Sequence, residues 1–518
     1  MDKVILSIDC GTQSLRVLMY SPEGDLLAKE QVQYEPYVSP MPGWAEQDPE
    51  IFWNSVCTAS LALKEKHPEW FAKVAGVGVT TQRDSMVNVD REGNPLRPVI
   101  TWLDQRKAKP VYHPSLVTRT VFKTIGMDEP ILKSQTDAKC NWIRQNQPEI
   151  WLKTHKYLQV SGFLNFRLTG QYIDSIGSQI GHIPFSYKKQ KWSSKTDMSR
   201  KLFPVERKKL PDLVPPGELI GYISDNAATS TGIAKGTPVI ACASDKGCET
   251  LGMGVLNEDM ASLSFGTTAT VQTTTKDYRE PQKFMPSYPA PIPGFYNPEI
   301  EIFRGFWMIT WFKNEFAFQE IQEAEAQGVP AEVVLNNLLK QSPPGAMGLI
   351  VQPYWSPGLK TPSAKGAMIG FGDVHKKAHV YRAVIEGLCY ALLDGLQHIE
   401  SSTGKKMKKL AVSGGASQSA EICQIAADVF NLPLVRGRTH ETSGLGAAIV
   451  TAVGLKIFPS FKEAINKMVQ YDQTFYPIQE NVKIYDQMFN RVYQKIYPVL
   501  LPLYEEIRDI TGYPSILQ

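Results

Sequence analysis

A turn rich in small and hydroxyl residues joins two apolar segments at the start of the chain. Its sequence is Asp9-Cys10-Gly11-Thr12-Gln13-Ser14-Leu15-Arg16. Glycine lets backbone N–H groups approach a phosphate closely, and an aspartate at a strand end can hold the Mg²⁺ that accompanies phosphate. An ordinary hairpin turn with a surface aspartate would have a similar composition. The motif therefore needs a second feature before it indicates phosphate binding.

That second feature is a similar turn in the other half of the chain, Ser264-Phe265-Gly266-Thr267-Thr268. It lies between β-rich runs at residues 260–265 and 269–275. Two such loops on facing domains would grip a polyphosphate from both sides. The sequence has no GxxxxGK[ST] loop that would compete for this role. We therefore predict a polyphosphate site built from both turns.

An acidic residue follows the apolar run 237–243, in the segment Ala243-Ser244-Asp245-Lys246-Gly247. A carboxylate at the carboxyl end of a strand, aimed into a cleft, is placed to accept a proton from a substrate hydroxyl. The remaining needs of phosphoryl transfer are positioning and neutralisation of charge. A capping role for Asp245 at a helix start is the alternative interpretation.

A second polar group, Gln82-Arg83-Asp84, follows another predicted strand, residues 74–80. An arginine beside an aspartate supplies both donors and acceptors, which suits vicinal hydroxyls of a substrate. A solvated ion pair on the surface is the alternative.

The elements that must position these groups alternate between strand and helix. β-rich runs at 4–8, 15–20 and 26–34 predict a three-stranded meander. A helix is predicted over 49–66, because Asp48 can cap it and proline at position 49 suits its first turn. The strand over 74–80 follows, which indicates an α/β fold.

The strand, glycine turn and strand of residues 5–20 recur at 260–275, and this repeat predicts two similar domains. Later segments predict a strand at 409–413, a tight turn at Gly414-Gly415, and helices over 419–430 and 444–453. We expect the domain boundary near 252–257. The tail beyond about residue 459 is predicted to be helical, especially over 482–507, and to pack on the second domain.

Composition excludes several classes of protein. The chain has 518 residues, 43% of them hydrophobic, and a net charge of +3, which gives no reason to expect a nucleic-acid or anionic-membrane partner. No stretch approaches the roughly 20 apolar residues of a membrane span, and the N-terminal apolar run is short for a signal peptide. The seven cysteines form no CxxC pair. These features predict a soluble cytoplasmic enzyme with reduced thiols and no metal bound by cysteine.

The motifs together resemble the FGGY carbohydrate kinases, relatives of glycerol kinase and xylulokinase in the hexokinase–actin superfamily. The resemblance runs from about residue 5 to residue 455, and its order and spacing are jointly specific. The matching segments are the DxGTxSxR turn (9–16), PGWAEQDP (42–49), TTQRD (80–84), TWLDQR (101–106), GLIVQPYWSPG (348–358), RAVIEG (382–387), SGGASQS (413–419) and ETSGLGAA (441–448), together with Asp245 and Gly266-Thr267-Thr268.

The resemblance implies an α/β fold with two ribonuclease-H-like (actin-like ATPase) domains facing an interdomain cleft. We expect domains at 1–252 (sugar side) and 253–458 (nucleotide side), and a helical extension at 459–518. The implied reaction is ATP-dependent phosphorylation, with Mg²⁺, of a hydroxyl of a small sugar (ketose) or polyol. A homodimer is one assembly that the resemblance leaves open.

The resemblance also assigns roles to residues. Asp9 and Asp245 are similar to the Mg²⁺-associated pair, and Asp245 is also similar to the general base. The positions that match phosphate contacts are Thr12, Gln13, Arg16, Gly266, Thr267 and Thr268. Those that match the adenosine pocket are Gly414, Gly415 and Ser419, and the acceptor is expected near Arg83, Asp84, Trp102 and Asp245.

Departures from the family pattern leave the acceptor open. Glycerol kinases have Gln-Arg-Glu where this chain has the shorter Asp84, and a Tyr where it has Ser134. The Met-His-Gly segment typical of xylulokinases is absent. On the nucleotide side, Thr310 and Ser419 replace a Gln and an Asn of glycerol kinases. Glycerol kinase, xylulokinase, another pentulose kinase, a catalytically weak sugar- or nucleotide-binding regulator, and an actin-like assembly protein therefore remain alternatives.

Overall fold

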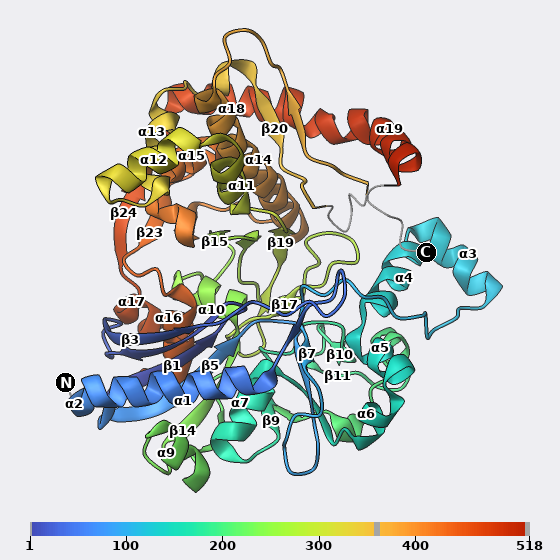
Figure 1. The fold of residues 1–518 in the computed structure, drawn as a ribbon, viewed down its shortest axis with the longest axis vertical. Helices are drawn as coiled ribbons and strands as arrows, with labels where there is room; N and C mark the ends of the chain where they lie inside the picture. Colours follow the sequence, from blue (N-terminus) through green and yellow to red (C-terminus); the bar gives the residue numbers. More distant parts are fainter. Residues whose placement is uncertain (1–2, 357–362, 513–518) are drawn as a thin grey trace. The chain divides into compact units, whose positions relative to one another are not determined.

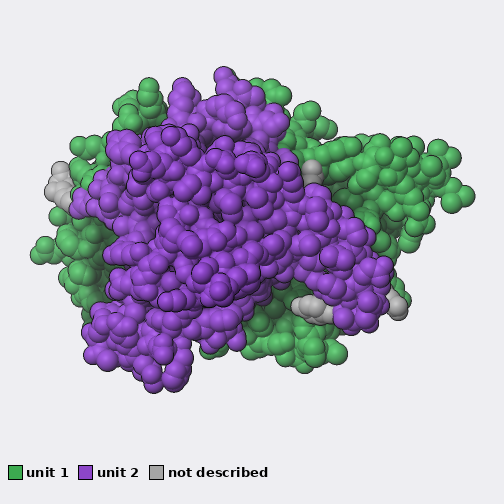
Figure 2. All heavy atoms as spheres, turned by 90° about the horizontal axis from the view of Figure 1, so that it is seen from above, with its two compact units in different colours: residues 1–256, 274–297, 441–470 green, residues 257–273, 298–440, 471–518 purple. Residues whose placement is uncertain are grey.

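The computed structural model describes residues 3–356 and 363–512 (Figure 1). The chain forms two compact units, and neither is one continuous stretch of sequence (Figure 2). Unit 1 contains Met1–Leu256, Thr274–Asn297 and Glu441–Gln470, and unit 2 contains Asn257–Thr273, Pro298–His440 and Tyr471–Gln518. The first change of unit falls inside the predicted boundary region 252–257. The expected domains were contiguous, whereas in the structure two later segments return to unit 1.

The main sheet of unit 1 has the strand order β13-β14-β5-β1-β2-β3. Its strands are β1 (Val4–Cys10), β2 (Ser14–Tyr20), β3 (Leu26–Gln33), β5 (Val74–Thr81), β13 (Leu219–Tyr222) and β14 (Pro238–Ser244). The first three form the predicted antiparallel meander, and β1, β5 and β14 are parallel. The carboxyl ends of these three strands therefore meet at one edge of the sheet, which is where open α/β sheets bind ligands.

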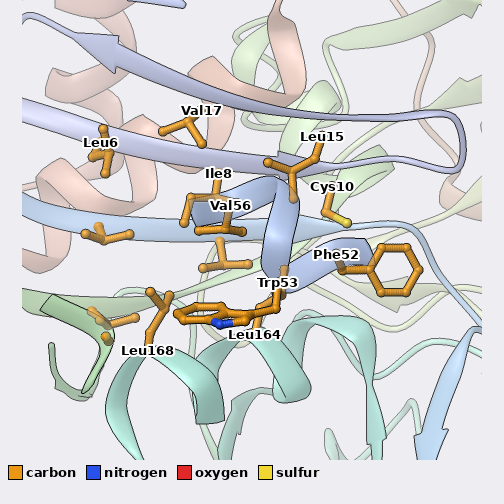
Figure 3. Close-up of a cluster of buried hydrophobic side chains, with 14 of the residues drawn as sticks. Leu6, Ile8, Cys10, Leu15, Val17, Phe52, Trp53, Val56, Leu164 and Leu168 are labelled. Atoms are coloured by element: carbon orange, nitrogen blue, oxygen red, sulfur yellow. The ribbon is translucent and has the colours of Figure 1, made fainter. Parts of the chain in front are cut away.

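Both faces of this sheet are buried, which explains the nearly continuous apolar sequence of β1. On one face, Leu6, Ile8 and neighbouring side chains pack against Phe52, Trp53 and Val56 of α1 (Pro49–Lys66) and against α7 (Val160–Thr169), as Figure 3 shows. On the other face, Ile5, Leu18 and Tyr20 join α10 (Asp245–Gly252), α16 (Thr442–Gly454) and α17 (Phe461–Met468). Packing of α16 on β1 and β5 is why residues 441–470 belong to unit 1.

Helix α1 begins as predicted. The Asp48 side chain accepts a 3.0 Å hydrogen bond from the backbone N–H of Glu50, and Pro49 occupies the first helical position. Such a cap satisfies one of the donors that a helix start leaves without an intrahelical partner.

The rest of unit 1 lies largely between β6 and β14 in sequence. A small sheet has the order β4-β7-β6-β8: β4 (Glu46–Gln47), β7 (Val99–Ile100), β6 (Met86–Val89) and β8 (Lys156–Gln159). The other elements are α2 (Pro68–Phe71), α3 (Leu116–Ile125), α4 (Asp128–Asp137), α5 (Lys139–Asn146), α6 (Pro148–Lys153), α8 (Met198–Leu202), α9 (Asp225–Thr231), β9 (Ile173–Ser175), β10 (Phe185–Ser186), β11 (Lys191–Trp192), β12 (Asp212–Val214), β17 (Tyr288–Pro289), β18 (Tyr296–Asn297) and a 3₁₀ turn, η1 (Arg207–Lys209).

Unit 2 has a second sheet, with the strand order β19-β16-β15-β22-β23-β24. Its strands are β15 (Met260–Phe265), β16 (Ala269–Gln272), β19 (Glu299–Ile302), β22 (Lys409–Ser413), β23 (Leu434–Gly437) and β24 (Tyr471–Phe475). As in unit 1, one strand of an antiparallel hairpin, here β15, pairs with a parallel strand, β22, and that strand pairs with a further parallel strand, β23. The predicted repeat of the hairpin is therefore confirmed as two sheets of related topology.

Among its described residues, the remaining elements of unit 2 are helical apart from the antiparallel pair β20 (Ile350–Gln352) and β21 (Ala367–Ile369). The helices are α11 (Trp307–Phe316), α12 (Phe318–Gln327), α13 (Ala331–Lys340), α14 (Lys377–Thr403), α15 (Ala420–Phe430), α18 (Gln479–Met488) and α19 (Gln494–Thr511), with 3₁₀ turns η2 (Ala346–Gly348) and η3 (Gly415–Gln418) and a π-helical segment, η4 (Phe489–Tyr493). The last two residues of the GLIVQPYWSPG segment, 357 and 358, lie outside the described residues.

The C-terminal tail is divided between the units. Helix α17 packs with α16 in unit 1, whereas β24, α18 and α19 belong to unit 2. Residues 471–475 form a strand where the sequence predicted helix, because they pair antiparallel with β23 at the edge of the second sheet. The RAVIEG segment explains how α18 is held: Arg382 and Glu386 of α14 both hydrogen-bond the Tyr485 hydroxyl, at 2.8 Å each.

Two further expectations concern thiols and membranes. All seven cysteines are free thiols, and six of them are buried. Within residues 3–356 and 363–512, no helix has the length and apolar character needed to cross a membrane.

Candidate active site

Three predicted residues reach one edge of the unit 1 sheet because three parallel strands end there. Asp9 lies at the end of β1 and pairs in register with Thr80 of β5. Arg83 is the second residue after β5, and Asp245 follows directly after β14. The register of β14, with Ser244 opposite Thr81, aligns these strand ends. The sheet therefore gathers residues that are up to 236 positions apart, from Asp9 to Asp245, into one place.

Asp9 is buried and is joined to the turn-flanking arginine of its own hairpin. Arg16 Nη1 lies 3.3 Å from Asp9 Oδ2, and Arg16 Nε lies 3.4 Å from Glu441 Oε2. Glu441 also pairs with Lys29 Nζ at 2.7 Å. Arg16 is thus fixed between two carboxylates, one of which begins the ETSGLGAA segment.

The electrostatics of this edge favour bound positive charge. Burial raises the pKa of Asp9 to about 7; Arg16 opposes this shift, and the negative charges of Asp245 and Glu441 add to it. Burial likewise raises the pKa of Asp245, against the cations Arg83 and Lys246. Burial raises both pKa values, so positive charge bound near these carboxylates would stabilise their ionised forms. Carboxylate oxygens are the ligands of hard cations, and Mg²⁺ is usually held by one or two of them plus phosphate and water, so this donor pair fits Mg²⁺.

Asp245 is the first residue of α10, but it does not cap that helix. The cap is Ser244, whose hydroxyl accepts from the backbone N–H of Gly247 at 3.4 Å. Asp245 Oδ1 accepts from the backbone N–H of Lys246 at 2.7 Å. Ser244 therefore has the capping role that was considered for Asp245, and the Asp245 carboxylate is not used as the cap of α10.

Arg83 and Asp84 do not form a solvated surface pair. The Arg83 guanidinium lies 5.3 Å from the ring centre of Tyr288. Asp84 forms an ion pair with the buried Lys139 and a 2.8 Å hydrogen bond with His182 Nδ1, and only 17% of its side chain is exposed. Burial alone would raise the pKa of Asp84, but Lys139 and His182 together hold that pKa well below its usual range. Asp84 is therefore an ionised, strongly held carboxylate.

Trp102 is held against the first glycine turn by a chain of hydrogen bonds. Its Nε1 donates to Thr12 Oγ1 at 2.9 Å, and the Thr12 hydroxyl donates to Gln82 Oε1 at 3.2 Å. Gln47 Nε2 completes the network by donating to the Thr12 carbonyl at 2.9 Å. Four short motifs that are separate in sequence thus form one network, which explains why they occur together.

A second network supports the TWLDQR segment from behind. Arg106 pairs with Asp104 at 2.7 Å and with Glu46 at 2.8 Å, and its guanidinium lies 3.7 Å from the ring centre of Trp44 and 4.6 Å from that of Trp142. Removing one member of such a buried ion pair destabilises the folded protein, because the charge of the other member is left uncompensated. This cluster therefore holds the backbone of the TWLDQR segment, which contains Trp102.

A cavity of about 500 Å³ adjoins the first turn within unit 1. Its lining includes Gln13 and Arg16, two of the predicted phosphate contacts, together with Gln31, Gln33 and Tyr34. Most of the lining is polar, and its charged residues are Arg16 and Glu35, one of each sign.

The predicted nucleotide residues lie in unit 2, where two turns follow neighbouring parallel strands. Ser264 of β15 pairs in register with Ser413 of β22, so Gly266 and Gly414 emerge side by side. The Gly266 carbonyl accepts from the backbone N–H of Phe306 at 3.0 Å, and Thr268 Oγ1 donates to the Phe303 carbonyl at 3.2 Å. Thr267, at the tip of the turn, is exposed.

Gly414 and Gly415 have different environments. Gly414 has φ of +89°, and a Cβ there would lie 2.7 Å from the carbonyl carbon of Phe265, whereas a Cβ on Gly415 would meet no atom within 4 Å. Ser419 caps α15: its hydroxyl accepts from the backbone N–H of Ile422 at 3.2 Å. Gly414 is therefore the residue that allows the two turns to approach each other.

Replacing Gly414 by alanine should destabilise the protein, because alanine is strained at this φ and its Cβ would collide with backbone. We expect a loss of roughly 2 to 3 kcal/mol in the free energy of unfolding of unit 2. Thermal unfolding of Gly414→Ala and of the matched control Gly415→Ala measures this. Equal midpoints for the two variants would contradict the packing of the two turns.

Several residues of this site were not singled out from the sequence. Glu441 lies in ETSGLGAA, a segment that the family resemblance had marked, so a signal was present. His182 lies in a loop and Tyr288 begins the short strand β17, and neither position belongs to a recognised motif. Only the fold brings them to Asp84 and Arg83.

Comparison with known proteins assigns the family. The N-terminal domain model of the FGGY family of carbohydrate kinases matches residues 4–252, and the C-terminal domain model matches residues 261–455. The chain belongs to the FGGY family of carbohydrate kinases. It is therefore a sugar kinase, a phosphotransferase, and kinases of this family use ATP, generally with Mg²⁺.

Relatives of this FGGY kinase extend over almost its whole length. It is 30% identical over 495 residues to the uncharacterized sugar kinase YgcE of Escherichia coli, covering 95% of this chain and 93% of that protein. It is 27% identical over 504 residues to a xylulose kinase of Lactococcus lactis (95% and 96% covered), and 26% identical over 492 residues to a gluconokinase of Bacillus subtilis (94% and 94%).

A solved structure has the same fold. The ligand-bound xylulose kinase of Lactobacillus acidophilus superposes with a TM-score of 0.82 at 21% sequence identity, covering 97% of this chain and 99% of that one. The two sheet-containing domains of this FGGY kinase thus have the actin-like ATPase fold that the sequence predicted.

Proposed function

We propose that this FGGY kinase transfers the γ-phosphoryl group of ATP to a hydroxyl of a small sugar, a ketose or a polyol. The observation that carries the proposal is the common edge of β1, β5 and β14, where Asp9, Arg83 and Asp245 lie at or just after the ends of three parallel strands. Family membership supplies the reaction class, and these residues supply the chemistry at the acceptor side.

Asp245 is the proposed general base. As the acceptor oxygen bonds to the γ-phosphorus, its O–H bond breaks and the proton passes to the Asp245 carboxylate, while the bond from the γ-phosphorus to the bridging oxygen breaks and ADP leaves. A raised pKa makes this carboxylate a stronger base than an exposed aspartate. Arg83 supports the proposal because it is a cation near Asp245 that can hold an acceptor oxygen.

The other proposed contacts follow their place in the fold. Asp9 and Asp245 would hold Mg²⁺, which when bound neutralises phosphate charge. The proposed phosphate contacts are Thr12, Gln13, Arg16, Gly266, Thr267 and Thr268, the proposed adenosine contacts are Gly414, Gly415 and Ser419, and the proposed acceptor contacts are Arg83, Asp84, Trp102 and Asp245. We infer a cytoplasmic location from the need for ATP and from the seven free thiols.

A screen of acceptors tests the proposed function. ADP release with Mg²⁺ and ATP is measured over glycerol, erythritol, xylulose, ribulose, rhamnulose, fuculose and gluconate. Because the curated relatives include xylulose kinases and gluconokinases, we expect turnover of a ketose or sugar acid to exceed turnover of glycerol. The shorter Asp84, held by two partners, also differs from a glycerol site. ADP release that no acceptor stimulates would overturn the proposal.

A further inference from the structure

A loop without a sequence motif lies between the two strand ends of the candidate acceptor site. It contains residues 177–182. At its start, Gly177 bridges to Ala243, and its carbonyl accepts from the backbone N–H of Ser244 at 3.1 Å, next to Asp245. At its end, the Ile180 carbonyl accepts from the backbone N–H of Asp84 at 3.2 Å. The loop is thus bonded to both proposed acceptor-side carboxylate segments.

His182 ends this loop in a defined orientation. Its backbone N–H donates to Asp84 Oδ1 at 2.9 Å, and its ring Nδ1 lies 2.8 Å from Asp84 Oδ2. The close approach requires glycine at position 181, since a Cβ there would lie 2.3 Å from the Asp84 carboxylate. Tyr187 holds the same glycine by hydrogen bonds to its N–H and its carbonyl, at 3.0 and 3.1 Å.

The tautomer of His182 follows from this geometry. Asp84 is ionised, so it accepts hydrogen bonds only, and ring Nδ1 must carry the proton of the Nδ1–Oδ2 hydrogen bond. Ring Nε2 is then directed away from Asp84 and is the ring nitrogen left for another hydrogen bond. Among the residues that the structure describes, none hydrogen-bonds this nitrogen, and 29% of the His182 side chain is exposed. An oriented ring nitrogen with no partner among the described residues therefore lies beside the proposed acceptor site.

Asp84 has little capacity left for a substrate. Its Oδ2 accepts from Lys139 Nζ and His182 Nδ1, and its Oδ1 accepts from the His182 backbone. A carboxylate has about four lone-pair sites, so one remains. A second hydroxyl of a polyhydroxy acceptor would need another hydrogen-bonding group, and His182 Nε2 is the one that the same loop supplies.

We propose that His182 is a further specificity-determining residue of this kinase: its Nε2, oriented by Asp84, forms a hydrogen bond with a hydroxyl of the sugar next to the oxygen held by Arg83. The inference rests on the proposed function, because it assumes that the acceptor binds beside Arg83 and Asp84. The proposal implies that the acceptor of this kinase has vicinal hydroxyls, one near Arg83 and one near His182.

Two variants separate substrate contact from support of Asp84. His182→Asn keeps an amide N–H close to the position of Nδ1 and so can still bond Asp84, but it has no atom at the position of Nε2. His182→Gln reaches the position of Nε2 but loses the bond to Asp84. With the best acceptor of the screen above, we expect His182→Asn to raise KM by about tenfold with little change in kcat, and His182→Gln to retain more of the acceptor affinity. ADP affinity, measured by calorimetry, should be the same in both variants.

The inference is overturned if the KM values of the two variants rank in the opposite order. If His182 only supports Asp84, His182→Asn will keep a KM within about twofold of wild type and His182→Gln will be the impaired variant. Loss of ADP affinity in both variants would likewise assign His182 to the fold alone. A wild-type enzyme that turned over no acceptor would be a different failure, since it would overturn the proposed function together with this inference.

Discussion

Asp245→Asn should lose turnover with every acceptor, by about 10²- to 10⁴-fold, because asparagine keeps the size of the side chain but cannot accept the proton. The fold should be intact, since the α10 cap is Ser244 and does not involve the carboxylate. Affinity for ADP should persist through the proposed nucleotide contacts in unit 2, with some weakening because one of the two proposed Mg²⁺ carboxylates is lost. Steady-state kinetics and ADP calorimetry measure both quantities.

The chain provides a matched control for this variant. Asp225 is also the first residue of a helix, α9, and also follows a serine cap, Ser224, but it is exposed and pairs with Lys235 at 2.8 Å. Asp225→Asn should retain wild-type turnover. If Asp245→Asn turned over the best acceptor within about threefold of wild type, far less than base removal should cost, the proposed base would be wrong. Asp84 would then be the carboxylate to examine, although its low pKa makes it a weak base.

Arg83→Ala should reduce kcat/KM for the true acceptor by on the order of 10²-fold or more, because buried polar partners are left unmatched. Affinity for ATP should hardly change. Arg83 also lowers the pKa of Asp245, so its removal lets that pKa rise, and the base is then ionised only at higher pH. The acid limb of the pH profile of kcat/KM should therefore move to higher pH.

Arg91→Ala is the matched control, since Arg91 is an exposed arginine in the turn between β6 and β7. It should leave the kinetics and the pH profile unchanged. Equal loss of acceptor and nucleotide affinity in Arg83→Ala would mean that the substitution had damaged the fold. An unchanged acid limb would mean that Arg83 does not act on Asp245.

The sequence predicted the elements that have local signals. Asp48 and Pro49 fixed the start of α1, and alternation of apolar runs with glycine turns gave both hairpins, because these signals act within a few residues. The repeated hairpin predicted two related sheets. The order and spacing of eight short motifs indicated the family, and the family comparison agrees.

Other features depended on contacts between distant residues. Glu441 reaches Arg16, and residues 471–475 are a strand, because α16 covers one sheet and β23 offers an edge to pair with. His182 had no sequence signal, yet it binds Asp84, 98 positions away. Local spacing cannot specify such pairs, because they depend on where β5 and β14 end and on how the loop after β9 crosses between them. The sequence by itself therefore determined the family, the repeated hairpins and the expected chemistry. Tertiary packing decided which side chains surround Asp84, because only packing sets the distance between loops that are far apart in the chain.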